Sequence, residues 1–280
     1  MPIVTISRGS YSRGKEVAEA LADKLGYECV SRDILLATCD EFSIPETRLI
    51  KALHDAPSIL DRFSHGRERY ISYFRAAFFN HMVKDNIVYH GLSGHFFLDG
   101  IQHVLKARII ANMDDRITEE MKRENCSSEE ARYLLKKDDD ERRKWGMSLY
   151  GKDTWNCSLY DLVLNIDMLK VEKVVDILED VIKDGRFNAT PESTEILKKR
   201  AKLASIHAII VNDSPRAIVS IKDEIATLSN IEGRLKTDTD YRLKMTERII
   251  QDFNLKDVVY AKAVSSKKDH INPFYNLDFK

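Results

Sequence analysis

Apolar residues in the first 185 positions form short runs separated by longer amphipathic segments. The runs are rich in β-branched residues, a pattern typical of buried strands. The predicted strands are residues 2–6, 27–30, 87–89, 104–111 and 160–166. Between them, residues 16–25 and 171–182 repeat apolar side chains at helical spacing and precede a glycine, and residues 35–83 are expected to be mostly helical. Alternating strands and helices predict an α/β domain over residues 1–185, with helices on both faces of a parallel sheet.

The pattern changes after a polar segment, residues 186–194, which contains Pro191 and is a predicted linker. The following elements are a helix over 195–210, strands over 216–221 and 225–231 joined by a tight turn, a helix over 238–253 and a strand over 257–264. This αββαβ order predicts a small α+β domain over residues 195–265. Residues 266–280 are expected to form an irregular tail.

Composition narrows the class of protein. Of the 280 residues 43% are hydrophobic, enough for a buried core, and Lys+Arg 44 against Asp+Glu 45 gives a net charge of -1. This balance argues against nucleic acid or an anionic membrane as the main partner. No apolar run is long enough to span a bilayer, and the N-terminus lacks the apolar core of a secretory signal. The four cysteines form no CxxC pair, so we expect reduced thiols in a soluble, cytoplasmic protein.

The turn after the first strand carries the strongest chemical signal. Gly9 and Gly14-Lys15 match the pattern G-x-x-x-x-G-K, between a predicted strand and a predicted helix. In that setting backbone amides face phosphate at a helix N-terminus, the lysine contacts the outer phosphates, and a following Ser or Thr binds Mg²⁺. Glu16 stands at the Ser/Thr position; its carboxylate would repel phosphate but can hold Mg²⁺ through water.

A strand, a turn and a helix with two glycines also occur in α/β proteins that bind no nucleotide. The turn also contains three cations, Arg8, Arg13 and Lys15. These favour an anion site, because they repel one another in one turn unless an anion joins them. The sequence therefore predicts anion binding at this turn.

The opening strand, loop and helix, Val4–Arg8 followed by Gly9–Gly14 and Lys15–Ala18, resemble the cytidylate-kinase-like branch of the P-loop nucleoside monophosphate kinases. The resemblance covers roughly residues 1–185 and continues, in the expected order, at Ser31–Leu35, His90–Gly94, Arg108–Ala111, Asp139–Arg143 and Trp155–Asn165. It implies a P-loop kinase-like sheet, ATP and Mg²⁺ as cofactors, and a nucleoside monophosphate, CMP or dCMP by default, as the phosphate acceptor.

Two alignments compete at the phosphate loop. An ungapped match of the helix places Gly14 where the family has its lysine, whereas the literal motif assigns that role to Lys15. The usual role of the lysine in the transition state is therefore open.

The resemblance also implies roles for individual residues. Lys15, Arg142 and Arg143 would be catalytic, with Asp139 as the acidic residue of the lid that bears the two arginines. Because Glu16 replaces the hydroxyl ligand, Mg²⁺ would be held mainly by phosphates and water. The implied ATP-binding residues are Arg8, Ser12, Arg13, Gly14, Lys15, Glu16 and Arg116, and the implied acceptor-binding residues are Asp33, Gly91, Ser93 and Gly94.

Simpler explanations exist for several of these residues. Asp33 also fits a helix cap, and the charged run at 136–143 fits a solvated helix with ion pairs. Leu92 replaces an arginine that in the family helps to hold the acceptor, which removes a bidentate phosphate ligand. Trp155 and Tyr160 are expected to pack the return of the lid against the core.

Residues 195–265 resemble a BON-type module, mainly through Arg216–Asp223 and Ile225–Ser229, although Glu224 replaces the usual glycine of the turn. Such a module implies a ligand or protein partner and a regulatory or interaction role.

Three hypotheses follow for the whole chain. The first is a nucleotide kinase, favoured by the lid cations. The second is a nucleotide-binding sensor with weakened catalysis, favoured by Leu92, Glu16 and the shifted lysine. The third, a purely structural interaction protein, leaves the cationic turn without an anion.

Overall fold

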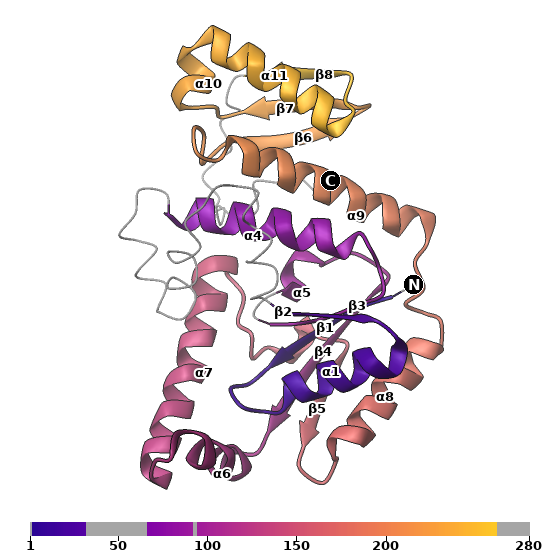
Figure 1. Cartoon of the computed structure of the whole chain (residues 1–280), viewed down its shortest axis with the longest axis vertical. Helices are drawn as coiled ribbons and strands as arrows, with labels where there is room; N and C mark the ends of the chain where they lie inside the picture. Colours follow the sequence, from indigo (N-terminus) through magenta and orange to yellow (C-terminus); the bar gives the residue numbers. More distant parts are fainter. Residues whose placement is uncertain (1, 32–65, 92–93, 262–280) are drawn as a thin grey trace. The chain divides into compact units, whose positions relative to one another are not determined.

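The computed structural model describes residues 2–31, 66–91 and 94–261 (Figure 1). The chain forms two compact units, one from Met1–Leu35 and Lys84–Thr194 and the other from Leu36–Val83 and Glu195–Lys280. Expectations for Asp33, Leu92 and Ser93, for residues 35–65 and for the tail lie outside the described residues.

The first unit is built on a five-stranded parallel sheet, which confirms the predicted α/β class. Its strands are β1 (Ile3–Arg8), β2 (Glu28–Ser31), β3 (Ile87–His90), β4 (Val104–Ala111) and β5 (Leu162–Ile166), in the order β2-β3-β1-β4-β5. β1 lies between β3 and β4, so the loop that follows it opens at the carboxyl edge of the sheet, where ligands of such folds bind.

The helices of the first unit are α1 (Gly14–Leu25), α5 (Gly94–Phe97), α6 (Met113–Glu124), α7 (Ser128–Tyr150) and α8 (Val171–Lys183). α1 and α8 pack on one face of the sheet against inward side chains such as Val4, Leu105 and Ile109. Because side chains alternate along a strand, Ser7 and Arg108 lie on the opposite face.

α7 begins with a capping box, in which Ser127 accepts from the amide of Glu130 and the Glu130 side chain accepts from the Ser127 amide. α1 ends at Gly26, whose φ of 68° is the left-handed conformation that glycine adopts without strain. These local signals fix the bounds of helices that carry predicted site residues.

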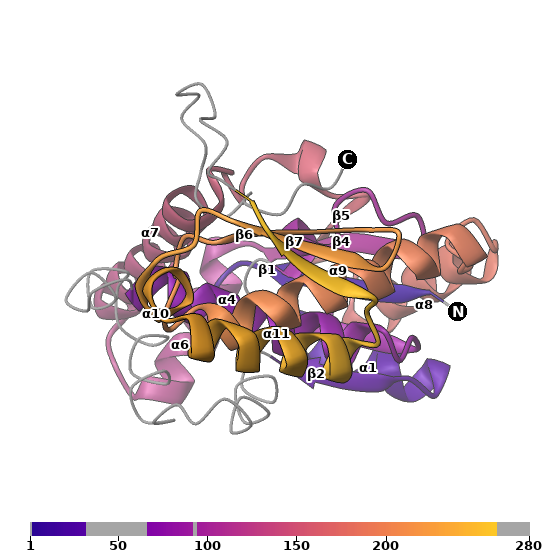
Figure 2. The same ribbon diagram turned by 90° about the horizontal axis from the view of Figure 1, so that it is seen from above.

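The second unit contains α4 (Gly66–Met82), most of α9 (Pro191–Ile210), β6 (Ile218–Lys222), β7 (Ile225–Ser229), α10 (Gly233–Thr237), α11 (Thr239–Phe253) and β8 (Asp257–Tyr260). β6 pairs with β7 antiparallel and β7 with β8 parallel, and α11 runs beside this mixed sheet (Figure 2). Apolar residues of α9, the sheet and α11, among them Ile206, Leu228 and Ile249, form its core. The predicted αββαβ order is present, with the short helix α10 added.

Two expectations about the link between the units need changes. Residues 191–194 of the predicted linker form the first turn of α9, because Pro191 suits a first helical position and Thr190 and Ser193 cap the helix reciprocally. In addition, α4 groups with the second unit and not with the first 185 residues. The reason is that side chains of α4 hydrogen-bond α9: Ser72 to His207 at 2.7 Å and Asn80 to Ser205 at 3.1 Å.

Among the described helices, none has the length and apolar character that crossing a membrane requires.

Candidate functional site

The loop between β1 and α1 has a conformation that is unusual for its residues. Tyr11 and Arg13 have φ values of 52° and 58°, in the left-handed region that non-glycine residues rarely occupy. Each such residue costs on the order of 1 kcal/mol or more, so the contacts around the loop must impose this shape. Backbone outliers of this kind gather at ligand sites, which makes the loop a candidate.

Ser12 holds the loop from inside. Its buried hydroxyl lies 3.1 Å from the carbonyl oxygen of Gly9 and 2.9 Å from that of Ile109 on β4. A hydroxyl has one proton, so the two contacts share it. The side chain of Ser12 thus ties the loop to the sheet, and its predicted contact with phosphate is left to the backbone amide.

α1 presents an anion-binding end to the edge of the sheet. Its N-cap, Arg13, makes no side-chain capping bond to any described residue, and the amides of the first turn, Gly14, Lys15 and Glu16, have no partner within the helix. These amides and the helix dipole together favour a negative group at this point.

The three cations of the turn are not equivalent. Arg13 donates two hydrogen bonds to Glu16, at 2.8 and 2.7 Å, and Lys15 lies 3.5 Å from Glu19 with its side chain 61% exposed. Both pairs are exposed and therefore weak. The mutual repulsion that suggested an anion is nevertheless smaller than the sequence implied, because two of the three cations have carboxylate neighbours on their own helix.

Arg8 explains why position 14 is glycine. A Cβ atom added at Gly14 would lie 2.7 Å from Cβ and 3.2 Å from Cδ of Arg8. The aliphatic part of the Arg8 side chain thus fills the space that a side chain at position 14 would enter. In the ungapped alignment Gly14 stands at the position of the family's lysine. The aliphatic part of the Arg8 side chain therefore lies next to that position in this chain.

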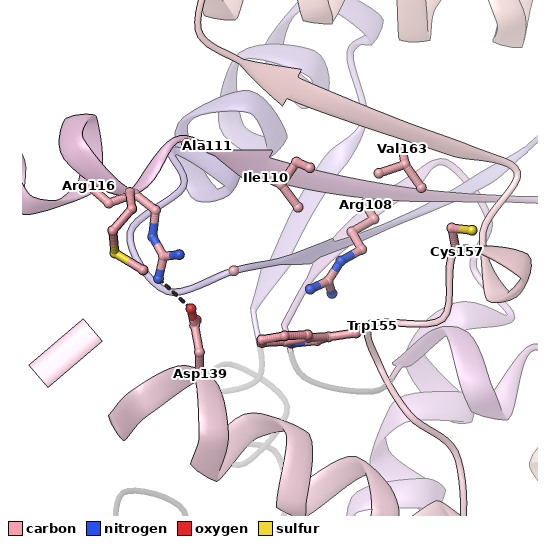
Figure 3. Close-up of a pocket in the computed structure, with 10 residues that line it drawn as sticks. Arg108, Ile110, Ala111, Arg116, Asp139, Trp155, Cys157 and Val163 are labelled. Atoms are coloured by element: carbon pink, nitrogen blue, oxygen red, sulfur yellow. Dashed lines mark hydrogen bonds and ion pairs between the residues drawn. The ribbon is translucent and has the colours of Figure 1, made fainter. Parts of the chain in front are cut away.

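Arg116 and Asp139 connect the loop to two helices. Arg116 of α6 donates from Nε to the carbonyl of Ser10 at 2.7 Å and from Nη2 to Asp139 of α7 at 2.8 Å, and Asp139 accepts from the Ser10 amide at 3.0 Å (Figure 3). The two side chains are only 9% and 13% exposed. Arg116, which the resemblance places near the donor base, has in the structure a clear role in positioning the loop.

The predicted lid arginines lie on α7. Arg143 makes a bidentate pair with Asp153, at 2.5 to 3.0 Å, and its guanidinium lies 5.0 Å from the centre of the Trp155 ring. These hydrogen bonds raise the pKa of Arg143 and lower that of Asp153. Arg142 is half-buried. The structure thus places Arg143 beside the candidate site while its charge is shared with Asp153.

Of the predicted acceptor-binding residues, the structure describes two. Gly91 follows β3, and its amide donates to the carbonyl of Ile6 at 3.4 Å. Gly94 is buried at the start of α5. They lie at the same edge of the sheet as the loop, since β3 and β1 are neighbours.

The sequence reading missed Arg108 as a candidate. Arg108 is 9% exposed, and its Nη1 donates to the hydroxyls of Ser7 at 3.2 Å and Tyr160 at 3.4 Å. The Tyr160 hydroxyl itself donates to the carbonyl of Thr154 at 2.9 Å. Two signals were available: Arg108 begins one of the segments that carry the resemblance, and it is an arginine within an apolar strand, at a position facing away from Leu105 and Ile109.

Two cavities adjoin this assembly. The larger has a volume of about 330 Å³ and lies along β4 and β5 between Gly9, Arg108, Asp139 and Trp155 (Figure 3). The smaller, about 190 Å³, lies between the loop, α6 and the segment after β5. Arg116 lines both, so the two cavities meet at the residue that holds the phosphate loop.

Comparison with known proteins assigns the family. Residues 3–168 match the model of the cytidylate kinase-like family, and this match spans more than half of the chain. The chain belongs to the cytidylate kinase-like family. Among curated proteins no match is found.

Comparison of this cytidylate kinase-like chain with solved structures gives matches at low sequence identity. An uncharacterized protein from Eubacterium ventriosum has a TM-score of 0.51 at 18% identity, covering 65% of this chain and 99% of its own. A shikimate kinase from Bacteroides thetaiotaomicron has a TM-score of 0.42 at 10% identity, covering 65% of this chain and 98% of its own.

Membership of this family supports a nucleotide kinase in general. Kinases of this kind generally use ATP and Mg²⁺. Neither the BON-type assignment of the C-terminal residues nor the choice of acceptor base follows from it.

Proposed function

We propose that this cytidylate kinase-like protein transfers the γ-phosphoryl group of ATP to a nucleoside monophosphate, with CMP or dCMP as the default acceptor. The observation that carries the proposal is the place of β1, which leads into the phosphate loop: on one side lies β4, whose Ala111 lines the smaller cavity, and on the other lies β3, which Gly91 follows. A transfer between two nucleotides requires two sites that converge on one phosphate-binding element.

The donor nucleotide is assigned to the loop and the smaller cavity. Its phosphates would accept hydrogen bonds from the amides of Gly14 to Glu16, with Arg8 and Lys15 as nearby cations. Its nucleoside would occupy the cavity of about 190 Å³, between Tyr11 and Arg13 on one side and Asp167 and Lys170 on the other.

Magnesium fits this site only through phosphate and water. The carboxylate of Glu16 accepts two hydrogen bonds from Arg13, and the hydroxyl of Ser12 is turned to backbone carbonyls. Within the described ranges no group of three His, Cys, Asp or Glu side chains could hold a metal ion. Bound with ATP, Mg²⁺ would neutralise charge on the phosphates.

The acceptor is assigned to Asp33, Gly91, Ser93 and Gly94, the residues implied by the family, of which Gly91 and Gly94 are described and follow β3. Arg142 and Arg143 of α7 would neutralise charge on the transferred phosphoryl group. Phosphoryl transfer depends on positioning and on cations, so no protein nucleophile is needed.

The test is ATP consumption with Mg²⁺ against a panel of ribo- and deoxyribonucleoside monophosphates. Lys15→Ala and Arg142→Ala are compared with Lys198→Ala and Lys144→Ala, exposed lysines on α9 and α7. We expect turnover with one acceptor and a loss of roughly tenfold or more in kcat/KM in the first two variants only, in line with the loss of a charged contact. Equal rates with and without every acceptor would refute the kinase.

A specific observation favours a second function, a nucleotide-binding sensor with weak turnover. Lys15 lies beside Glu19 on the outer surface of α1, where a residue needed in the transition state is not expected. In that case ATP binding, measured by calorimetry, would persist in a protein that consumes no ATP, and the C-terminal unit would report occupancy to a partner.

A further inference from the structure

The first residue of α1, Gly14, has no conformational need to be a glycine. Its φ is not positive, and glycine within a helix is unfavourable relative to alanine. What requires glycine is the close approach of Arg8, whose Cβ, Cγ and Cδ atoms lie 2.7, 3.5 and 3.2 Å from the place of a Cβ atom at position 14. The stem of Arg8 therefore occupies the space beside the helix end.

The alternation of side chains along β1 brings Arg8 to this place. Val4 and Ile6 are buried in the core that α1 and α8 form with the sheet, so Arg8, two residues further on, points to the same face. As the last residue of β1 it lies at the carboxyl edge of the sheet, where it is half-buried. The amides of the first turn of α1, which have no partner within the helix, open at the same edge.

Lys15, the lysine of the literal motif, leads away from this edge. Gly14 is buried and Lys15 is exposed, so position 14 faces the sheet and position 15 faces outward. The Nζ atom of Lys15 lies 3.5 Å from Glu19, one turn further toward the C-terminus of α1. A side chain that serves phosphate at a helix N-terminus has to reach in the opposite direction.

The chain thus places an arginine beside the position that the family fills with lysine. In the ungapped alignment that position is Gly14, and the guanidinium of Arg8 is attached two bonds beyond the Cδ atom that lies against it. Arginine stays charged at physiological pH, and its fork of N–H groups binds two phosphate oxygens at once. It can therefore supply the cation that phosphoryl transfer needs on the outer phosphates.

We propose that Arg8 is the catalytic cation of the phosphate loop and that its guanidinium contacts the β- and γ-phosphates of ATP. The assignment rests on the proposed kinase function for the identity of the ligand. In the transfer, an oxygen of the acceptor phosphate forms a bond to the γ-phosphorus, the bond from that phosphorus to the β–γ bridging oxygen breaks, and ADP leaves. Arg8 neutralises the charge that develops and exchanges no proton. Lys15 contributes to ATP binding.

Steady-state kinetics of the full chain separate the two cations. ATP, Mg²⁺ and the acceptor identified by the panel are used with Arg8→Met, Arg8→Lys, Lys15→Ala and the control Arg186→Met, an exposed arginine. Methionine keeps an unbranched stem beside Gly14 and removes the charge. We expect Arg8→Met to lower kcat by on the order of 100-fold and to raise the KM for ATP roughly tenfold, and Arg8→Lys to keep part of kcat.

Lys15→Ala should raise the KM for ATP roughly tenfold, while its kcat falls far less than that of Arg8→Met. Two results would overturn the role of Arg8. One is a kcat for Arg8→Met equal to that of the parent protein and Arg186→Met. The other is a loss of kcat in Lys15→Ala as large as the loss in Arg8→Met.

Moving the cation from the strand to the helix tests the shared position directly. Gly14→Lys alone forces a side chain into the space of Arg8, so it should be unstable and inactive. Combined with Arg8→Ala, which empties that space, the same lysine should recover roughly tenfold or more of the kcat that Arg8→Ala loses. Circular dichroism first establishes that the double variant is folded. A folded double variant no faster than Arg8→Ala would contradict the shared position.

Failure of this assignment and failure of the kinase can be told apart by calorimetry with ATP and AMP. If no acceptor supports turnover, the kinase is contradicted, and Arg8 is judged by binding alone. A loss of roughly tenfold in affinity for ATP but not for AMP in Arg8→Met then supports Arg8 at the outer phosphates. Equal ATP affinity in Arg8→Met and the parent protein overturns it, with or without turnover.

Discussion

Arg108 and Arg116 lie on the same stretch of chain, one on β4 and the other in the first turns of α6, and both are more than nine-tenths buried. Arg116 has a carboxylate that is 13% exposed and a backbone carbonyl as partners, whereas Arg108 has two hydroxyls. A buried cation with an internal anion holds the structure together. Arg108 has no carboxylate partner among the described residues, so its contribution to stability is expected to differ from that of Arg116.

The largest effect on stability is expected when the pair of Arg116 and Asp139 is broken. Asp139→Ala removes the partner of a buried guanidinium and the acceptor of the Ser10 amide, so it should lower the free energy of unfolding by about 3 kcal/mol. Urea unfolding measures it, with the exposed neighbour Asp140→Ala as control, expected within ~0.5 kcal/mol. A loss below ~1 kcal/mol for Asp139→Ala would mean that the pair is not structural.

The next effect is a pH dependence of stability that comes from His95, which lies near Arg108. Burial, and then the charge of Arg108, lowers the pKa of His95 to about 3. The unfolded chain takes up a proton on this histidine below about pH 6.5 and the folded chain does not, so stability is complete above that pH and falls as the pH drops. At pH 5 the loss from His95 is about 2 kcal/mol.

His95→Phe checks this, because the ring contacts that of Tyr160, with 4.8 Å between the ring centres, and its Nε2 has no partner among the described residues. Unfolding curves at pH 7.5 and pH 5 should differ less for the variant than for the parent. His207, whose pKa is lowered to about 4 by burial, keeps part of the acid sensitivity. An unchanged difference would show that His95 is charged in the folded state.

A smaller effect is expected in the phosphate loop. Gly14→Ala places a Cβ 2.7 Å from that of Arg8, so either the loop or Arg8 must move, at a cost of about 1 kcal/mol in stability. ATP binding should weaken with it. Gly9→Ala is the matched control for stability, since its Cβ would have no neighbour nearer than 3.9 Å. Equal melting temperatures for the two variants would contradict the packing argument.

The smallest effect completes the comparison of the two arginines. Arg108→Met replaces an unpaired buried cation with an apolar side chain of similar length, so stability should change by no more than ~1 kcal/mol in either direction. Thermal unfolding measures it without ligand. A loss as large as that of Asp139→Ala would show that Arg108 is structural and would remove the contrast between the two arginines.

Much of the candidate site was predictable because it is local. The loop lies between a buried strand and an amphipathic helix, and both follow from the spacing of apolar residues around Gly9 and Gly14. Local spacing also explains why the cations of the turn repel one another less than their number suggests. Arg13 and Glu16 are three apart and Lys15 and Glu19 four apart, so their pairing follows from helix geometry alone.

The amino-acid sequence by itself determined the parallel sheet, the position of the phosphate loop and the family, since each depends on short-range periodicity or on ordered motifs. Only the tertiary structure decided which arginine holds the loop and which faces the cavity. Arg116 meets Ser10 from 106 positions away and Arg108 meets Ser7 from 101, and no local pattern encodes such contacts. They arise because β1 and β4 are neighbours in the sheet, which brings distant side chains to one edge.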